Sequence, residues 1–210
     1  MTTASPGTMP VVDVASAWCS SGTSWAGAGL VAALLSAAAV GCTTVAPGRP
    51  AHTAGPAAPA RTITIPNQVD GFTRSPRLEQ QTDVAALAAG VSKSSAGAAS
   101  NVRSAVYEQG NLASGANAKI FMFVGGTLAH GAAAASFFNF ERAYPSAHAV
   151  SAGSLPGDAA CTTTAVNKES TSMCVWFDQD TFGTLVSPTM TTAELATTMD
   201  EVRPSLERES

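Results

Sequence analysis

Hydrophobic residues recur with two different periods along residues 62–210, and these periods predict the elements of one folded domain. Segments in which apolar and polar residues alternate are predicted strands, because successive side chains of a strand point to opposite faces. Segments with apolar residues three or four positions apart are predicted amphipathic helices. The predicted strands are 62–65, 102–107, 120–124, 148–154, 161–166 and 173–177, the last of which hairpins into 184–186. The predicted helices are 78–91, 131–143 and a last helix that begins at Thr191.

Residues 120–124 form the most hydrophobic continuous run of the domain, Ile-Phe-Met-Phe-Val. A strand that is apolar on both faces must be covered on both sides, so this segment is the predicted central strand. The pair Gly125-Gly126 is predicted to end it. The helix at 131–143 is predicted to stop before Pro145, because proline does not continue a helix.

The last helix carries the clearest local signal. Thr191 and Glu194 have the spacing of a capping box, and Pro204 is predicted to end or kink the helix. The short connections between residues 161 and 186 predict hairpins. The predicted fold is therefore α+β, a largely antiparallel sheet packed by about three helices, in the order β-α-β-β-α-β-β-β-α.

The N-terminal residues differ in composition from the rest of the chain. Residues 1–48 contain no Lys or Arg, and their only acidic residue is Asp13. Residues 26–41 form an apolar run of the length of a signal-peptide core, shorter than the roughly 20 residues of a bilayer-spanning helix. The run ends in Ala-Val-Gly at 39–41, followed by Cys42, which resembles the bacterial lipobox. That resemblance implies that Cys42 receives diacylglycerol and becomes the mature N-terminus.

Residues 1–41 are therefore predicted to form a signal or membrane-targeting segment, with two alternatives. Lipobox sequences usually carry Leu where Ala39 stands, and the positively charged start of a signal peptide is missing. A mis-assigned start codon explains the second departure, with residues 1–25 as upstream sequence. The alternatives to a cleaved lipoprotein signal are an uncleaved membrane anchor and a buried alanine-rich helix.

Residues 42–61 are predicted to be a tether. Four prolines with small residues between them favour an extended chain that cannot form a packed core. At about 3.1 Å per residue, such a chain holds the domain at 62–210 up to several tens of Å from a membrane.

Charge excludes one class of partner. Charged residues make up 12% of the chain, the formal net charge is −4 and the pI is about 5.3. A nucleic-acid surface needs clustered positive charge, so none is expected. The predicted location is extracytoplasmic, on the outer face of the cell membrane, with the membrane and either an envelope protein or a small ligand as partners.

Cys161 and Cys174 are the only cysteines of the predicted domain. On adjacent strands of an exported protein, such a pair predicts a disulfide. The alternative is a metal site, but tetrahedral zinc needs two further ligands, and His130 and His148 are not at the spacing of a zinc finger. The sequence therefore favours the disulfide, and no metal or cofactor is expected.

One pattern in the domain resembles a group of known proteins. Cys161 is followed by Cys174-x-Trp176-x-Asp178-x-x-Thr181-x-Gly183, and later by Arg203 and Glu207 around the end of the last helix. The pattern, with Gly71-Phe72 and Gly125-Gly126 before it, resembles uncharacterised secreted or membrane-anchored proteins of high-GC Gram-positive bacteria. The resemblance spans residues 62–210 loosely. It implies export and the disulfide, and it supplies no catalytic residues.

Two segments of the chain match part of a known ligand-binding motif and lack residues that the motif requires. Gly126 and Gly131 have the spacing of a phosphate-binding P-loop, but alanines at 132–133 replace the required Lys and Ser or Thr. Residues 178–183 imitate the start of a calcium loop, but Thr189 stands where the bidentate glutamate belongs. Both segments are predicted turns.

The chain also lacks the usual signatures of hydrolases: it contains no Gly-x-Ser-x-Gly, His-Glu-x-x-His or Cys-x-x-Cys. His130 and His148 are candidate general bases without a visible nucleophile or orienting carboxylate. The leading hypothesis is a non-enzymatic, surface-tethered lipoprotein that serves as a binding or accessory domain. The alternatives are a membrane-anchored structural or sensory subunit of an envelope complex, and a hydrolase that uses His130 or His148.

Overall fold

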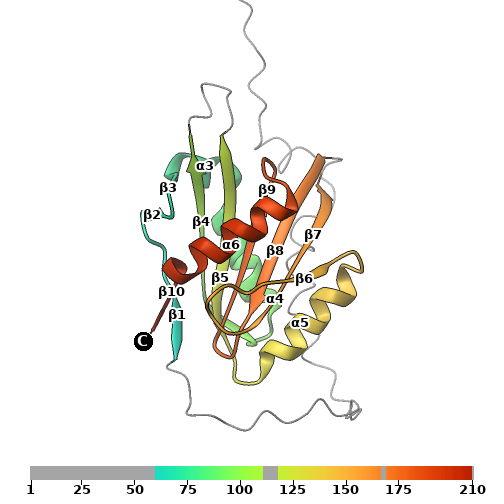
Figure 1. Cartoon of the computed structure of the whole chain (residues 1–210). Coiled ribbons are helices and arrows are strands. Elements are labelled where there is room, and N and C mark those ends of the chain that lie inside the picture. Colours follow the sequence, from blue (N-terminus) through green and yellow to red (C-terminus); the bar gives the residue numbers. More distant parts are fainter. Residues whose placement is uncertain (1–59, 111–117, 167–168, 210) are drawn as a thin grey trace, which may run out of the picture.

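The computed structural model describes residues 60–110, 118–166 and 169–209, which are coloured in Figure 1. The large sheet contains β2 (Gln68–Val69), β3 (Phe72–Arg74), β4 (Ala99–Gln109), β5 (Lys119–Leu128), β6 (His148–Val150), β7 (Asp158–Val166), β8 (Glu169–Phe177) and β9 (Thr181–Ser187). A second sheet pairs β1 (Arg61–Ile63) with β10 (Glu207–Glu209). The helices are α3 (Pro76–Thr82), α4 (Val84–Ser94), α5 (Ala132–Ala143) and α6 (Thr192–Leu206).

The large sheet is antiparallel, with the strand order β2-β3-β4-β5-β9-β8-β7-β6. Helices α4 and α5 pack against one face, and α6 crosses the other (Figure 1). The predicted α+β fold with a mostly antiparallel sheet is confirmed. Its helices lie on both faces, so both faces of the inner strands are buried.

Strand β5 lies inside the sheet, between β4 and β9, as its sequence predicts. Phe121 and Phe123 face the α6 side, whereas Met122 and Val124 face the α4 and α5 side. The strand does not end at Gly125-Gly126, as predicted from sequence. A Cβ at position 126 would lie 2.7 Å from the carbonyl oxygen of Ser100, so glycine here permits close approach of β4 to β5.

Strand β8 alternates between the two cores. Cys174 and Trp176 are buried on the α6 side, and Val175 and Phe177 are buried on the α5 side. This division follows from the strand predicted at 173–177, because successive side chains of a strand point to opposite faces. It places the large ring of Trp176 beside the position at which α6 ends.

The predicted helix at 78–91 is two helices. Asp83 lies between α3 and α4 with φ 47°, in the left-handed region, which breaks the helix without disturbing the apolar positions on either side. Helix α4 also continues through Gly90 to Ser94. At the other end of the chain, α6 has the predicted capping box but passes Pro204 and ends at Leu206, which is fully buried.

Short strands account for the other differences. The segment before Arg74, in which no element is predicted from sequence, is a small hairpin of β2 and β3. Strand β6 has three residues, not the seven predicted for 148–154. These strands are stabilised by pairing with β4 and β7 rather than by local pattern, so the sequence periods do not reveal them.

The predicted signal segment, Cys42 and nearly all of the predicted tether lie outside the described residues, as does 111–117, most of the turn predicted after β4. Within the described ranges, no helix combines the length and the hydropathy needed to cross a bilayer.

Candidate functional site

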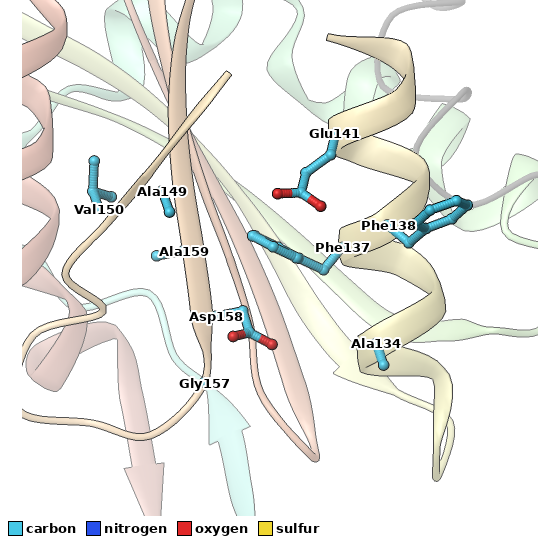
Figure 2. Close-up of a pocket in the computed structure, with 9 residues that line it drawn as sticks. All are labelled: Ala134, Phe137, Phe138, Glu141, Ala149, Val150, Gly157, Asp158 and Ala159. Atoms are coloured by element: carbon cyan, nitrogen blue, oxygen red, sulfur yellow. The ribbon is translucent and has the colours of Figure 1, made fainter. Parts of the chain in front are cut away.

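A pocket of about 430 Å³ lies between helix α5 and the strands at the β6 end of the sheet (Figure 2). Pockets that bind small molecules are typically about 300–1,000 Å³, so the volume is within that range. Its walls combine small and aromatic apolar groups with two carboxylates. The lining residues are Ala134, Phe137, Phe138, Glu141, Ala149, Val150, Gly157, Asp158 and Ala159.

Helix α5 supplies one wall through a stripe of residues at helical spacing. Ala134, Phe138 and Glu141 follow each other at four- and three-residue intervals, next to the core-facing stripe that contains Phe140. Phe137 lies between the two stripes. In Figure 2, its ring and the Glu141 side chain point from α5 toward the strands, whereas the Phe138 ring turns to the other side of the helix.

Strands β6 and β7 supply the opposite wall. Ala149 lies opposite Ala160 in the β6–β7 register, and Ala160 belongs to the core on the α5 side. Asp158, two residues before Ala160, is therefore on the same face, and Figure 2 shows its carboxylate directed toward α5. Both pocket carboxylates thus point into the space between helix and strands.

Neither pocket carboxylate is neutralised by the described part of the chain. Glu141 and Asp158 are exposed, and no described Lys, Arg or His lies within ion-pair distance of either. Phe138 is 62% exposed and is the one large hydrophobic side chain, among those described, that is fully at the surface. The pocket therefore offers negative charge beside apolar surface.

The two candidate general bases do not belong to this pocket. His130 is exposed in the turn before α5, and His148 is exposed at the start of β6. Within the described residues, neither histidine has a hydrogen bond or an ion pair to a carboxylate, and neither lines the pocket. Groups of three or more potential metal ligands are also not found in these parts of the chain.

Cys161 and Cys174 form a disulfide, which confirms that prediction and removes the metal alternative for these two residues. They are directly opposite each other in the antiparallel β7–β8 pair. Both sulfurs are fully buried on the α6 side of the sheet. The bond therefore links two neighbouring inner strands on the face of the sheet that α6 covers.

The segments of the two incomplete motifs are only partly turns, because each shares residues with a strand, β5 in the first and β9 in the second. Gly126 is inside β5, and Gly131 caps α5 with φ 78°. Asp178 begins the β8–β9 turn, where its Oδ1 accepts the backbone N–H groups of Asp180 and Thr181 at 2.8 and 2.6 Å. This carboxylate organises the turn rather than holding an ion.

A second group of charged residues is buried beside this turn. The Arg203 guanidinium is fully buried, 3.2 Å from Asp178 and 3.2 Å from Glu207, and it lies over the Trp176 ring. The Glu207 carboxylate accepts hydrogen bonds from the indole N–H of Trp176 and from the hydroxyl of Thr181. Burial raises the pKa of Glu207, and Arg203 opposes that rise. We call these five residues the Arg203 cluster.

The Arg203 cluster explains the sequence pattern noted above. Its five residues are five members of that pattern, although they come from β8, the β8–β9 turn, β9, α6 and β10. A Cβ at Gly183, a sixth member, would lie 2.1 Å from the Trp176 ring, so only glycine leaves room for the indole. The pattern therefore marks a packing unit of the core, and none of its members lines the pocket.

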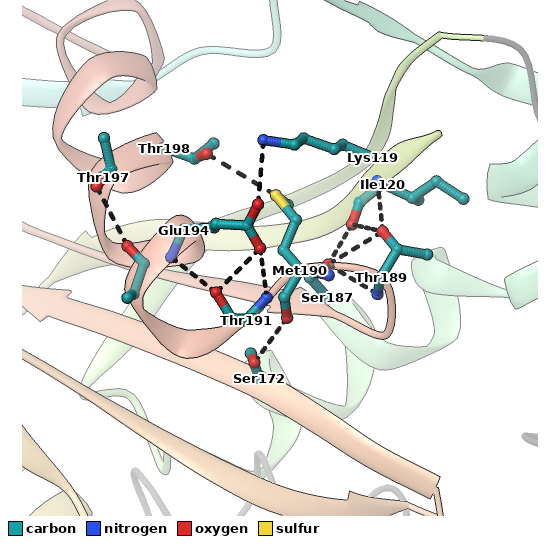
Figure 3. A network of polar contacts seen from close by, with 11 residues as sticks. Lys119, Ile120, Ser172, Ser187, Thr189, Met190, Thr191, Glu194, Thr197 and Thr198 are labelled. Atoms are coloured by element: carbon teal, nitrogen blue, oxygen red, sulfur yellow. Dashed lines mark hydrogen bonds and ion pairs between the residues drawn. The ribbon is translucent and has the colours of Figure 1, made fainter. Parts of the chain in front are cut away.

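A third polar network fixes the start of α6 to β5 (Figure 3). The backbone N–H of Thr191 donates to the Glu194 carboxylate, and the backbone N–H of Glu194 donates to the Thr191 hydroxyl. The Lys119 ammonium lies 3.4 Å from the same carboxylate. These contacts lower the pKa of Glu194, and the hydrogen bond from the Thr191 N–H has the largest effect. Nearby, the Ser187 hydroxyl donates to the Ile120 carbonyl at 2.6 Å. Every group serves a neighbouring backbone or side chain, so the network is a structural clamp.

The pocket beside α5 thus remains the candidate binding site, because it alone of the three polar regions presents exposed carboxylates that have no ion-pair partner among the described residues. No protein-family model, curated protein or solved structure matches this chain. Sequence reasoning did not single out Glu141 or Asp158. The one available signal was Phe138 next to Phe137, which places an aromatic residue outside the core stripe of a short helix.

Proposed function

We propose that the chain is a non-enzymatic, surface-tethered lipoprotein whose folded domain binds a cationic, partly apolar ligand in the pocket beside α5. The observation that carries the binding role is the pair of unpaired carboxylates, Glu141 and Asp158, directed into one pocket with an apolar wall. A positively charged group between them gains two charge-assisted contacts. Its apolar part packs against Phe137.

The position of the pocket is compatible with tethering. The predicted tether joins the domain at β1, which pairs with β10. Figure 1 shows β1 and α5 on opposite sides of the domain. A chain that enters at β1 therefore joins the domain on the side opposite α5 and the pocket.

Lipidation is the first part of the proposal to test. Expressed in a bacterium that processes lipoproteins, the mature chain is expected to begin at Cys42, carry lipid and partition into detergent. Cys42→Ala is expected to abolish processing, because the thiol is the acceptor of the lipid. Mass spectrometry of the mature N-terminus measures both outcomes. An unmodified N-terminus beyond residue 42 would replace the lipoprotein with an ordinary secreted protein.

The binding role is tested with two simple cations, tryptamine, which has an aromatic part, and agmatine, which does not. With the ¹⁵N-labelled full-length chain, tryptamine is expected to shift amide resonances of α5, β6 and the start of β7. Agmatine is expected to bind more weakly, since it covers less of Phe137. The variant Glu141→Gln is expected to reduce the shifts, whereas Glu201→Gln, an exposed carboxylate on α6, serves as the matched control. Shifts confined to other regions would contradict the proposed site.

A further inference from the structure

We infer that the occupant of the pocket is an extended basic segment of a partner protein, which adds as a strand to the free edge of β6 and places a Lys or Arg side chain between Glu141 and Asp158. The inference rests on the proposed function and specifies the class of partner. Three features carry it: an unpaired sheet edge, the direction of the side chains along that edge, and the charge of the pocket.

Strand β6 is the last strand of the large sheet. It pairs with β7 through His148, Ala149 and Val150, and no described residue hydrogen-bonds to its outer side. An exposed edge of this kind is a template for an added strand, and peptide recognition by strand addition uses it. The pocket adjoins this edge, since Ala149 and Val150 also line the pocket.

The register directs alternate side chains of an added strand toward the pocket. Ala149 faces the α5 side of the sheet, because it lies opposite the core residue Ala160. A residue paired beside Ala149 on the added strand points the same way, since paired residues in a sheet share a face. The methyl group of Ala149 leaves room for a long side chain from its neighbour.

The pocket matches a long basic side chain better than a neutral one. A Lys or Arg side chain has an apolar stem that packs against Phe137 and a charged end that meets the carboxylates. Glu141 points into the pocket from helix α5 and Asp158 from strand β7 (Figure 2). The positively charged end of the side chain therefore lies between two negatively charged carboxylates.

A second copy of this chain is a poorer occupant. Pairing of β6 with β6 of another copy about a two-fold axis brings identical surfaces together. The carboxylates Glu141 and Asp158 of the two copies would then approach each other, and like charges across an interface are destabilising. A basic partner segment removes this repulsion.

The test uses fluorescein-labelled peptides and the full-length chain in detergent micelles, with fluorescence anisotropy as the measurement. The probe is a Thr-Val-Arg-Val-Thr peptide, and the charge control has Glu in place of Arg. We expect the Arg peptide to bind and its affinity to fall as the salt concentration rises. The Glu peptide is expected not to bind. Glu141→Gln and Asp158→Asn are each expected to weaken binding about fivefold, and Glu201→Gln to leave it unchanged.

Strand addition is tested separately by N-methylation of the peptide. One peptide carries N-methyl groups on its first, third and fifth residues, and another on its second and fourth. Only one of these sets faces β6, because alternate N–H groups of a strand point to opposite sides. One methylated peptide is therefore expected to lose binding and the other to keep it. Equal binding of both would overturn strand addition.

The remaining outcomes separate this inference from the proposed function. If the Arg peptide fails to bind while tryptamine still shifts α5 and β6, the basic-strand inference is overturned and the binding site stands. If neither probe acts at the pocket, both are overturned. If sedimentation shows a dimer that is lost in an Asp158→Arg variant of unchanged stability, a second copy is the occupant and the inference is overturned.

Discussion

Replacing Arg203 with methionine is expected to lower the free energy of unfolding by about 3–5 kcal/mol, because it removes the cation from a buried cluster and leaves its partners in place. Among the described residues, Glu207 would then have no cation within ion-pair distance, and Asp178 would keep only Arg61, at 3.9 Å. Chemical unfolding followed by tryptophan fluorescence measures the loss, since Trp176 is part of the cluster.

Two further variants show that the loss comes from the cluster. Arg203→Lys keeps the charge but not the fork that donates to the carbonyl oxygens of Ala152 and Pro156, so an intermediate loss is expected. Arg203→Met combined with Glu207→Met removes both charges and is expected to recover part of the stability. A loss below about 1 kcal/mol for Arg203→Met alone would mean that the cluster is not a stabilising unit.

The loss in Arg203→Met is expected to shrink on acidification. Burial raises the pKa of Glu207 above its ordinary value of 4.5, and the cation of Arg203 limits that rise. Without Arg203 the pKa rises further, so the folded variant holds this proton at a pH at which the unfolded chain has released it. Its stability therefore falls as the pH rises through the folded-state pKa. Unfolding at about pH 5 and about pH 7 is the comparison, with the larger deficit expected at pH 7.

Removing the disulfide is the second change with a large expected effect. The bond joins Cys161 and Cys174, 13 residues apart, and closure of a loop of that length stabilises by about 3 kcal/mol in the chain-entropy model. Cys174→Ser is therefore expected to lower the free energy of unfolding by about 2–4 kcal/mol. Denaturant unfolding with and without reductant measures the effect. Reductant is expected to destabilise the protein with both cysteines and to leave the stability of Cys174→Ser unchanged.

The control is a double replacement of Cys161 and Cys174 by alanine. Serine introduces a hydroxyl at a fully buried position, and alanine does not, so the comparison separates loss of the bond from burial of a polar group. Peptide mapping without reductant is expected to yield the linked pair. Two free thiols in protein purified from the cell envelope would contradict the assignment.

Local patterns predicted the elements whose stability is decided close by in sequence. The continuous apolar run at 120–124 identified an inner strand, and Thr191 with Glu194 identified the start of the last helix. Helix α5 ended before Pro145, as expected. The disulfide was also predictable, because only two cysteines occur in the domain and their strands are consecutive.

Where contacts between distant residues decide the structure, the sequence alone was insufficient. Nothing in the local pattern at Asp83 indicated a break, and the glycines after 124 indicated an end where the strand continues. The three-residue strand β6 exists through its pairing with β7. In each case the local structure is stabilised by contacts with residues distant in sequence, which the local pattern of apolar and polar residues does not reveal.

The sequence by itself determined the class of fold, the disulfide and the positions of its most regular elements, since these follow from periodicity and from the number of cysteines. Only the tertiary structure brought Arg203 to Asp178, 25 residues earlier in the chain, and placed the guanidinium over the Trp176 ring. Only the tertiary structure placed Glu141 of α5 opposite Asp158 of β7. Packing of a helix against a sheet edge sets that separation, and no spacing along the chain encodes it.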